Sequence, residues 1–174
     1  MKKFTLSCFA VLITLILAVS VIGCAQSKTY TNTELGFSCQ YPADWDAEEN
    51  MMGALVIFAG PMTLDDTFMI NISIVTDELS DVYTVEEYSR LTELQFEKSG
   101  NDYVKIQGKN TTISGLPAIV QTFTVTVDDY PIKDIQAYFI KDMTAYIITY
   151  DTVEESHDKY TDYFDLVIST FKFE

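Results

Sequence analysis

The stretch that decides the fold is AIVQTFTVTV-DDYP-IKDIQAYFIK-DMT-AYIITYD, residues 118–151. It contains three segments rich in β-branched and aromatic residues, 118–127, 132–141 and 145–151, and this composition predicts β-strands. The connections between these segments are short and polar, whereas a parallel return requires a crossover of about a dozen residues or more. The three strands are therefore expected to be antiparallel neighbours in one sheet.

A β-hairpin is predicted near the start of the folded part of the chain. Residues 30–41 contain two strand-like runs around a turn with Gly36, and Pro42 ends the second strand because proline cannot continue a ladder. The single tryptophan, Trp45, follows at once. A lone tryptophan at this position is expected to fill a gap in the core.

Three further strands are predicted between the hairpin and residue 118. Segments 54–59 and 103–107 are short, and we expect Gly60-Pro61 and Gly108 to end them. Residues 68–75 alternate between two faces, as in a strand with one fully apolar face. The apolar face consists of Phe68, Ile70, Ile72 and Ile74.

A first helix is predicted to begin after Thr84, because Thr84 and Glu87 have the spacing of a capping box. Gly100 is placed to end it. The face predicted to be buried consists of Val85, Tyr88, Leu91 and Leu94 or Gln95. The face predicted to be in water carries Glu86, Glu93 and Glu97.

The last helix has the clearest pattern in the sequence. Apolar residues recur with the spacing of one buried helix face, at Tyr160, Tyr163, Phe164, Val167, Ile168 and Phe171. Thr152 and Glu155 have the spacing of a second capping box, and Ser156 offers a later start. Together the elements predict one α+β domain over residues 30–174, an antiparallel β-sheet covered by helices on one face or on both.

The N-terminus is typical of a lipoprotein signal peptide. Lys2 and Lys3 form a positive region, residues 4–22 are almost entirely apolar, and a small residue then precedes Cys24. In this pattern the cysteine thiol receives a lipid and the chain is cut just before it. We therefore expect a signal peptide over residues 1–23 and lipidation at Cys24.

A retained transmembrane anchor is the alternative, because an apolar run of 19 residues over 4–22 approaches the roughly 20 that cross a bilayer. The motif Val21-Ile22-Gly23-Cys24 favours the lipoprotein. Both alternatives place the domain outside the cytoplasm, and the first anchors it by lipid to the extracytoplasmic face of the cell membrane. Residues 24–29 would then form the lipidated N-terminus and a short linker, with the membrane as one partner.

The charge of the chain is strongly negative. The formal net charge is −15, and removing residues 1–23 takes away Lys2 and Lys3 but no acidic residue, which changes it to −17. Such a domain is repelled by nucleic acid and by anionic headgroups, so we expect no nucleic-acid partner. Cationic partners or divalent cations suit this charge, and solubility alone is the simpler explanation.

Three segments carry a family resemblance: GFSCQYPADW at 36–45, ISGLPA at 113–118 and ISTFKF at 168–173. They resemble the PsbP-like family, named after an extrinsic subunit of photosystem II. The resemblance implies an α/β/α sandwich of the kind shared with the nuclear-transport factor Mog. It also implies an accessory or docking module without enzymatic activity, whose relatives bind proteins and in some cases metal ions. No residue of this chain matches a family site motif, so the resemblance transfers no site.

The sequence offers few nitrogen or sulfur ligands for a metal ion. Zinc sites use clustered His and Cys, but the mature domain would have only His157 and Cys39. Calcium prefers carboxylates at close spacing, and the acidic pair Asp128 and Asp129 is the candidate here, although neither it nor the other acidic loops match an EF-hand. The sequence therefore predicts no cofactor, with a divalent cation as the open alternative.

Enzymatic chemistry is not indicated. Cys39 lies in a strand-like run and is expected to be buried and inert, and His157, with charged neighbours, is expected to be solvated. No nucleophile elbow, phosphate-binding loop or dinucleotide fingerprint is present. The sequence thus predicts a membrane-anchored lipoprotein that binds or assembles a membrane or envelope component, through a protein partner at the membrane surface. The alternative is a protein whose acidic loops bind a divalent cation or a small ligand.

Overall fold

The computed structural model describes residues 26–62, 68–127 and 130–174. Within them, seven strands form one antiparallel sheet in the order β3-β4-β5-β9-β8-β7-β6. The predicted antiparallel pairing of the three strands in 118–151 is confirmed. The bounds are Asp46–Glu49 (β3), Val56–Met62 (β4), Met69–Glu78 (β5), Val104–Ile113 (β6), Leu116–Val127 (β7), Tyr130–Lys141 (β8) and Thr144–Val153 (β9).

A second, three-stranded sheet was not expected from the sequence. It has the order β1-β2-β10, with bounds Ser27–Asn32 (β1), Phe37–Pro42 (β2) and Lys172–Phe173 (β10). The predicted hairpin over 30–41 is confirmed, and Gly36 in its turn has a φ of 62°. Residues 27–29, assigned to a linker above, instead pair with β2 as the first part of β1.

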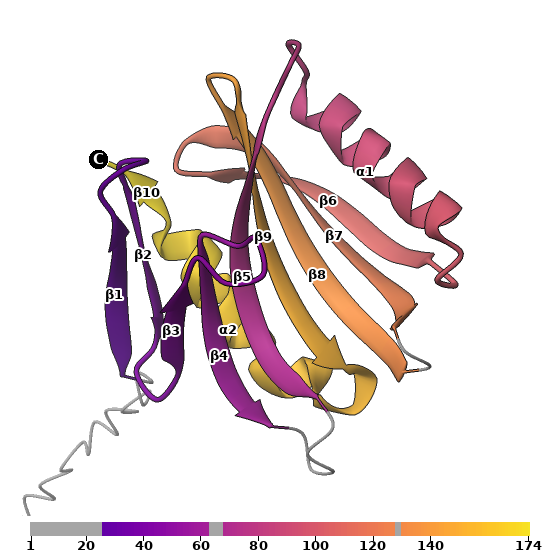
Figure 1. Cartoon of the computed structure of the whole chain (residues 1–174), viewed down its shortest axis with the longest axis horizontal. Helices are drawn as coiled ribbons and strands as arrows, with labels where there is room; N and C mark the ends of the chain where they lie inside the picture. The colour runs from indigo at the N-terminus through magenta and orange to yellow at the C-terminus, as the bar shows by residue number, and fades with distance from the viewer. Residues whose placement is uncertain (1–25, 63–67, 128–129) are drawn as a thin grey trace, which may run out of the picture.

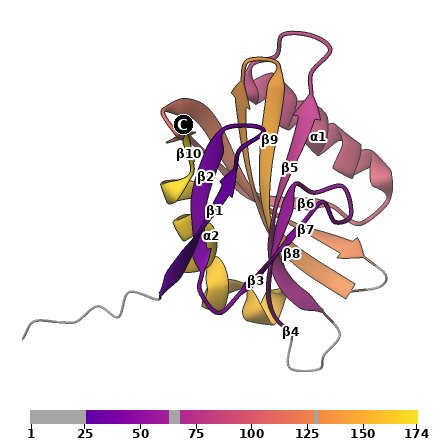
Figure 2. The ribbon, with the colours of Figure 1, turned by 60° about the vertical axis from the view of Figure 1, so that its left-hand side comes forward.

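The two α-helices of the described chain, α1 (Val85–Ser99) and α2 (His157–Thr170), cover opposite faces of the large sheet (Figures 1 and 2). Tyr138 of β8 contacts Tyr88 of α1, whereas the next residue, Phe139, contacts Phe171 at the end of α2. Successive residues of a strand point to opposite faces. The small sheet lies on the α2 side, where α2 packs on β2 and β9. Helices on both faces confirm the predicted α/β/α arrangement.

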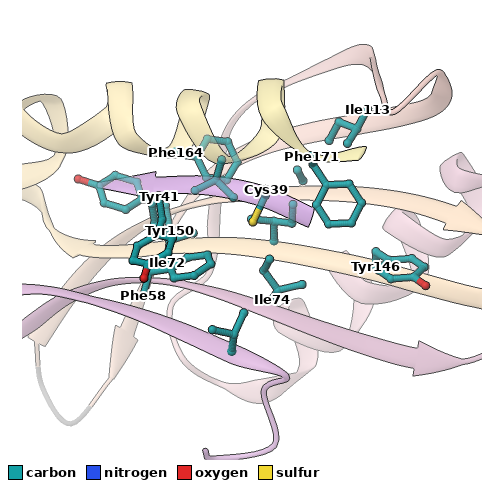
Figure 3. Packing of buried hydrophobic residues seen from close by; sticks show 14 of the residues in the cluster. Cys39, Tyr41, Phe58, Ile72, Ile74, Ile113, Tyr146, Tyr150, Phe164 and Phe171 are labelled. Atoms are coloured by element: carbon teal, nitrogen blue, oxygen red, sulfur yellow. The ribbon is translucent and has the colours of Figure 1, made fainter. Parts of the chain in front are cut away.

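The main core fills the space between the large sheet, the small sheet and α2 (Figure 3). The predicted apolar face of β5 is confirmed for Ile70, Ile72 and Ile74, all of which are buried there. Phe68 does not continue this face. It precedes β5 and packs instead against a smaller cluster under α1, formed by Phe123, Val125 and Ile132.

Trp45 fills the core as predicted, with 1% of its surface exposed. Its indole lies against Gly60, where an added Cβ would be 2.6 Å from Cζ2 of the indole and 2.9 Å from the carbonyl oxygen of Ile70. The prediction that Gly60-Pro61 ends the strand is wrong, because β4 continues to Met62 with a register shift after Ala59. Gly60 is therefore required by the indole and does not mark a strand end.

The strand predicted over 103–107 is twice as long as expected. β6 passes through Gly108, and after an irregularity between Lys105 and Gln107 it pairs with β7 up to Ile113. It is an edge strand whose residues are exposed until Ile113. The pairing with β7 decides its length, and this pairing has no local signature in the sequence.

The start and the end of α1 are confirmed. Thr84 and Glu87 form the capping box, and Gly100 ends the helix with a φ of 79°. The predicted buried face is wrong in part, since the fully buried residues are Val85 and Ser89, while Leu91 is 43% exposed. In the C-terminal half of the helix, Phe96 packs against Phe123 of β7.

The buried face of α2 is confirmed at Phe164 and Val167. The second capping box is wrong. Thr152 is still inside β9, where its hydroxyl group donates to the carbonyl of Val153. The chain then forms a 3₁₀ turn, η1 (Glu154–Ser156), and Ser156 precedes α2 without a side-chain capping bond.

Candidate functional site

Polar side chains form a row on the α1 side of the large sheet. Asn71 of β5 pairs with Asp151 of β9, and Asp151 pairs with Asp134 of β8. Asp134 lies on the same face as Tyr138, which contacts α1, because the two are four residues apart in one strand. Two carboxyl groups, in adjacent strands, thus lie on the face of the large sheet that α1 covers.

Both carboxyl groups are removed from water to different extents. Asp134 is 6% exposed, and its Oδ1 has no hydrogen-bond partner, whereas Asp151 is half-buried. Burial raises the pKa of Asp134 far above its ordinary value, and the negative charge of Asp151 adds to this effect. Burial also raises the pKa of Asp151, but hydrogen bonds from Asp134 and Asn71 partly offset the rise. Because burial raises both pKa values, the pair holds one proton at neutral pH.

A pair of this kind can share a proton or exchange it for a cation. Acid–base catalysis would also require access for a substrate to the carboxyl groups, and Asp134 is almost fully covered. Among the described residues, no group of three or more His, Cys, Asp and Glu side chains could hold a metal ion. The geometry thus supports a shared proton more directly than catalysis.

Asp134 was missed by the sequence analysis, although a signal was present. Lys141 pairs with Thr144 across a two-residue turn in which Asp142 has a φ of 55°. This turn fixes the register of the hairpin and places Asp134 opposite Asp151. Asp151 belongs to β9 and is thereby separated from Glu154 and Glu155 in the turn that follows the strand.

Three residues predicted from the sequence, Cys24, Asp128 and Asp129, lie outside the described residues. Their proposed roles in lipidation and cation binding therefore stay predictions. Other acidic residues near the end of β5 make local contacts. Asp77 accepts a hydrogen bond of 3.1 Å from the hydroxyl of Tyr88, and Asp81 accepts one of 2.8 Å from the backbone of Val82.

Cys39 is buried as predicted, with 1% of its surface exposed, and burial raises the pKa of its thiol to about 12. A thiol with this pKa is not a nucleophile at neutral pH. The prediction that His157 is solvated is wrong, since it is 7% exposed and packs against Tyr150. The first turn of α2 lies on β9, where the hydroxyl of Tyr150 donates to the carbonyl of His157. The imidazole Nδ1 is 2.8 Å from Asp158.

A groove lies between the β5–α1 connection and the first half of α1. We call it the α1 groove. Its volume is about 590 Å³. Two of its apolar residues are open to water, Val82 with 81% and Leu91 with 43% of the surface exposed. It is lined by Asp81, Val82, Tyr83, Glu86, Glu87, Arg90 and Leu91.

The charges around the α1 groove are mostly negative. Glu87 accepts hydrogen bonds from the backbone and side chain of Thr84, which lower the pKa of its carboxyl group and keep it ionised. Arg90 is the only basic residue of the lining, and Glu93 and Glu97 each pair with it at 3.2 Å. The groove thus combines exposed apolar groups with carboxylates that no basic lining residue neutralises.

No helix within the described residues is long and apolar enough to cross a membrane.

With the fold and these sites established, comparison with known proteins identifies the family. The model of the family described as PsbP-like protein matches residues 20–173. The chain belongs to the PsbP-like family. The resemblance noted in the sequence and the expected α/β/α fold are both confirmed by this match. A search among curated proteins by sequence finds no match.

Solved structures share the PsbP-like fold at low identity. Cyanobacterial PsbP (CyanoP) from Synechocystis sp. PCC 6803 is 19% identical with a TM-score of 0.62, over 91% of this chain and 99% of that chain. LpqN of Mycobacterium tuberculosis, described as involved in cell envelope biogenesis, is 10% identical with a TM-score of 0.65, over 84% and 90%. The Ran-binding protein Mog1p of Saccharomyces cerevisiae is 9% identical with a TM-score of 0.60, over 86% and 96%. At these identities the likeness establishes the fold alone.

Proposed function

We propose that this PsbP-like protein is a lipid-anchored, non-catalytic binding module on the extracytoplasmic face of the cell membrane. One observation carries the proposal. Strand β1 begins at Ser27, with only Ala25 and Gln26 between it and Cys24 in the sequence. The three steps of extended chain from Cys24 to Ser27 span roughly 10 Å. A lipid on Cys24 would hold the domain directly at the membrane surface, where a partner in the same membrane or envelope is within reach.

Binding is favoured over catalysis by the state of the reactive side chains. The thiol of Cys39 is buried and protonated, the ring of His157 is enclosed, and Asp134 is covered. Two proteins with the same fold support a role at the cell envelope or in protein binding. LpqN is described as involved in cell envelope biogenesis and Mog1p as a Ran-binding protein. The proposal takes from them only the general role of a module that contacts other envelope or protein components.

The proposed lipid anchor is tested by substituting Cys24. The variant Cys24→Ala should accumulate as a precursor that retains residues 1–23, which a shift in size on immunoblots of membrane fractions would reveal. The matched control is Cys8→Ala, inside the apolar segment, which should be processed like the natural chain. Identical processing of Cys24→Ala and the natural chain would refute the anchor.

A second candidate function is binding of a divalent cation. It is favoured by the unpartnered, buried Oδ1 of Asp134 beside Asp151, because a cation could take the place of the shared proton. The acidic pair Asp128 and Asp129 is the alternative location. Titration with Ca²⁺ or Mn²⁺ should then raise the melting temperature saturably, beyond the effect of NaCl at equal ionic strength. Loss of this rise in Asp134→Asn, or instead in Asp128→Asn/Asp129→Asn, would distinguish the two locations, and no rise would exclude both.

A further inference from the structure

We propose that the α1 groove is the docking site for a basic segment of another protein, one that carries an apolar side chain flanked by Lys or Arg. The inference rests on the binding function proposed above and names its surface and the chemistry of its partner. Three observations lead to it: the exposed apolar groups of the groove, its charges and its position relative to the lipidated end.

Exposed apolar side chains gather in this groove. Val82 is 81% exposed and lies in the connection that precedes α1, and Leu91 is exposed two turns into the helix. Single exposed apolar residues are common on protein surfaces. Here both line one concave surface together with Tyr83. A side chain inserted between them would bury apolar area on both partners.

The charge of the groove selects a basic partner. Asp81 and Glu86 are free of ion pairs in the described part of the chain, and Glu87 is held ionised by the helix cap. Arg90 is neutralised by its two glutamate partners. Complementary charge steers association and excludes partners of like charge. A second copy of this acidic chain is therefore a poor occupant.

The end of the domain that a lipid on Cys24 would anchor is the end where β5 begins. Ser27 pairs with Pro42, which leads into Trp45, and the indole of Trp45 lies against Gly60. Gly60 in turn approaches the carbonyl of Ile70, the second residue of β5. The beginning of β1 and the beginning of β5 are thus at the same end of the molecule (Figures 1 and 2).

The α1 groove lies at the other end of β5. The connection to α1 follows Glu78, and the amide of Leu79 donates to the carbonyl of Met143 in the turn between β8 and β9. A strand of ten residues spans about 30 Å. A domain tethered at Cys24 would present this groove to the space beyond the membrane surface. This position argues for a protein occupant and against the bilayer.

The experiment places a photo-reactive benzoylphenylalanine at position 82 of the full-length, anchored protein. Irradiation of intact cells and mass spectrometry of the adducts then map both crosslinked residues. The control carries the same group at position 104, where Val104 is 58% exposed on the edge strand β6. The expected result is an adduct from position 82, absent from position 104, to a segment of another protein with Lys or Arg beside the crosslinked residue.

Charge reversal then tests the chemistry of the site. The variant Asp81→Lys/Glu86→Lys should reduce the adduct about tenfold or more, because like charges would face each other. Glu155→Lys, an exposed residue at the opposite end of the large sheet, should leave the yield unchanged. Unchanged melting temperatures would confirm that the variants fold.

Four outcomes would overturn the proposal. They are no adduct at position 82, an equal adduct at position 104, an adduct only to lipid or to a second copy, and a yield insensitive to charge reversal. If the protein is anchored by lipid but gives no adduct, the docking proposal is refuted and the lipid anchor still holds. Failure of the Cys24→Ala test would refute the anchor without affecting the map of crosslinks.

Discussion

Asp134 in β8 and Asp151 in β9 stand directly opposite each other, and the pKa of each carboxyl group is raised by burial. Asp134 is 6% exposed, and the raised pKa values mean that the pair keeps one proton at neutral pH. The cost of keeping this acid neutral rises with pH, so the pair makes the stability of the fold depend on pH.

The variant Asp134→Asn should flatten this dependence. Below the ordinary aspartate pKa of about 3.9, native and unfolded chains both hold the proton. Above it the unfolded chain loses the proton while the native chain keeps it, so the free energy of unfolding falls by up to about 1.4 kcal/mol per pH unit. Urea unfolding between about pH 4 and pH 8 should show a weaker decline for Asp134→Asn than for the natural chain.

The control for this measurement is Asp44→Asn, because Asp44 is an exposed carboxylate in the turn before β3. Its unfolding free energy should follow that of the natural chain across the pH range. Parallel curves for the natural chain and Asp134→Asn would show that Asp134 holds no extra proton in the native state.

The contact between Gly60 and Trp45 predicts a selective effect of a single methyl group. In Gly60→Ala the new Cβ would meet the indole at 2.6 Å and a backbone carbonyl at 2.9 Å, so one of them must move. We expect a loss of about 1–3 kcal/mol in unfolding free energy, the usual effect of overpacking. Gly108→Ala is the matched control, because its nearest neighbour is the end of a lysine side chain at 3.4 Å. Equal losses in both variants would contradict the account of Gly60.

Substitutions in the capping box of α1 should lower the unfolding free energy by less than Gly60→Ala does. Thr84→Ala removes the side-chain oxygen that accepts from the amide of Glu87, and loss of such a cap costs about 1 kcal/mol. Glu87→Gln should cost less than Glu87→Ala, since glutamine also completes a capping box. Denaturant unfolding of the three variants checks this order, and a Glu87→Gln as damaging as Glu87→Ala would contradict it.

Cys39 should react with thiol reagents only when the domain unfolds. Its thiol is buried, and its pKa is raised to about 12, so the thiolate is scarce and covered. Labelling of the mature protein with a maleimide should be slow in buffer and fast in denaturing urea. Fast labelling in buffer, with the fold intact by circular dichroism, would show that the surroundings of the thiol are open.

Features set by neighbouring residues were predictable from the sequence. The cap at Thr84 and the buried face of α2 at Phe164 and Val167 depend on residues within a few positions of one another. The hairpin at Gly36 likewise follows from a local turn. The interactions that form each of these features join residues close in the sequence, and the structure confirms each of them.

Features set by distant contacts were not predictable in the same way. Gly60 was interpreted as a strand end, because the indole that requires a glycine there comes from Trp45, fifteen positions earlier. His157 was expected in water, because its burial depends on the contact between α2 and β9. The pairing of Asp134 with Asp151 is an intermediate case, since the turn at Asp142 determines it once the register is considered.

The measurement that tests the central claim most directly is the mass of the N-terminal peptide of the protein extracted from its membrane. The account predicts a peptide that begins at Cys24 and carries the added mass of a lipid on this cysteine. A chain that begins before residue 24 with an unmodified Cys24 would contradict the account and indicate a retained transmembrane anchor.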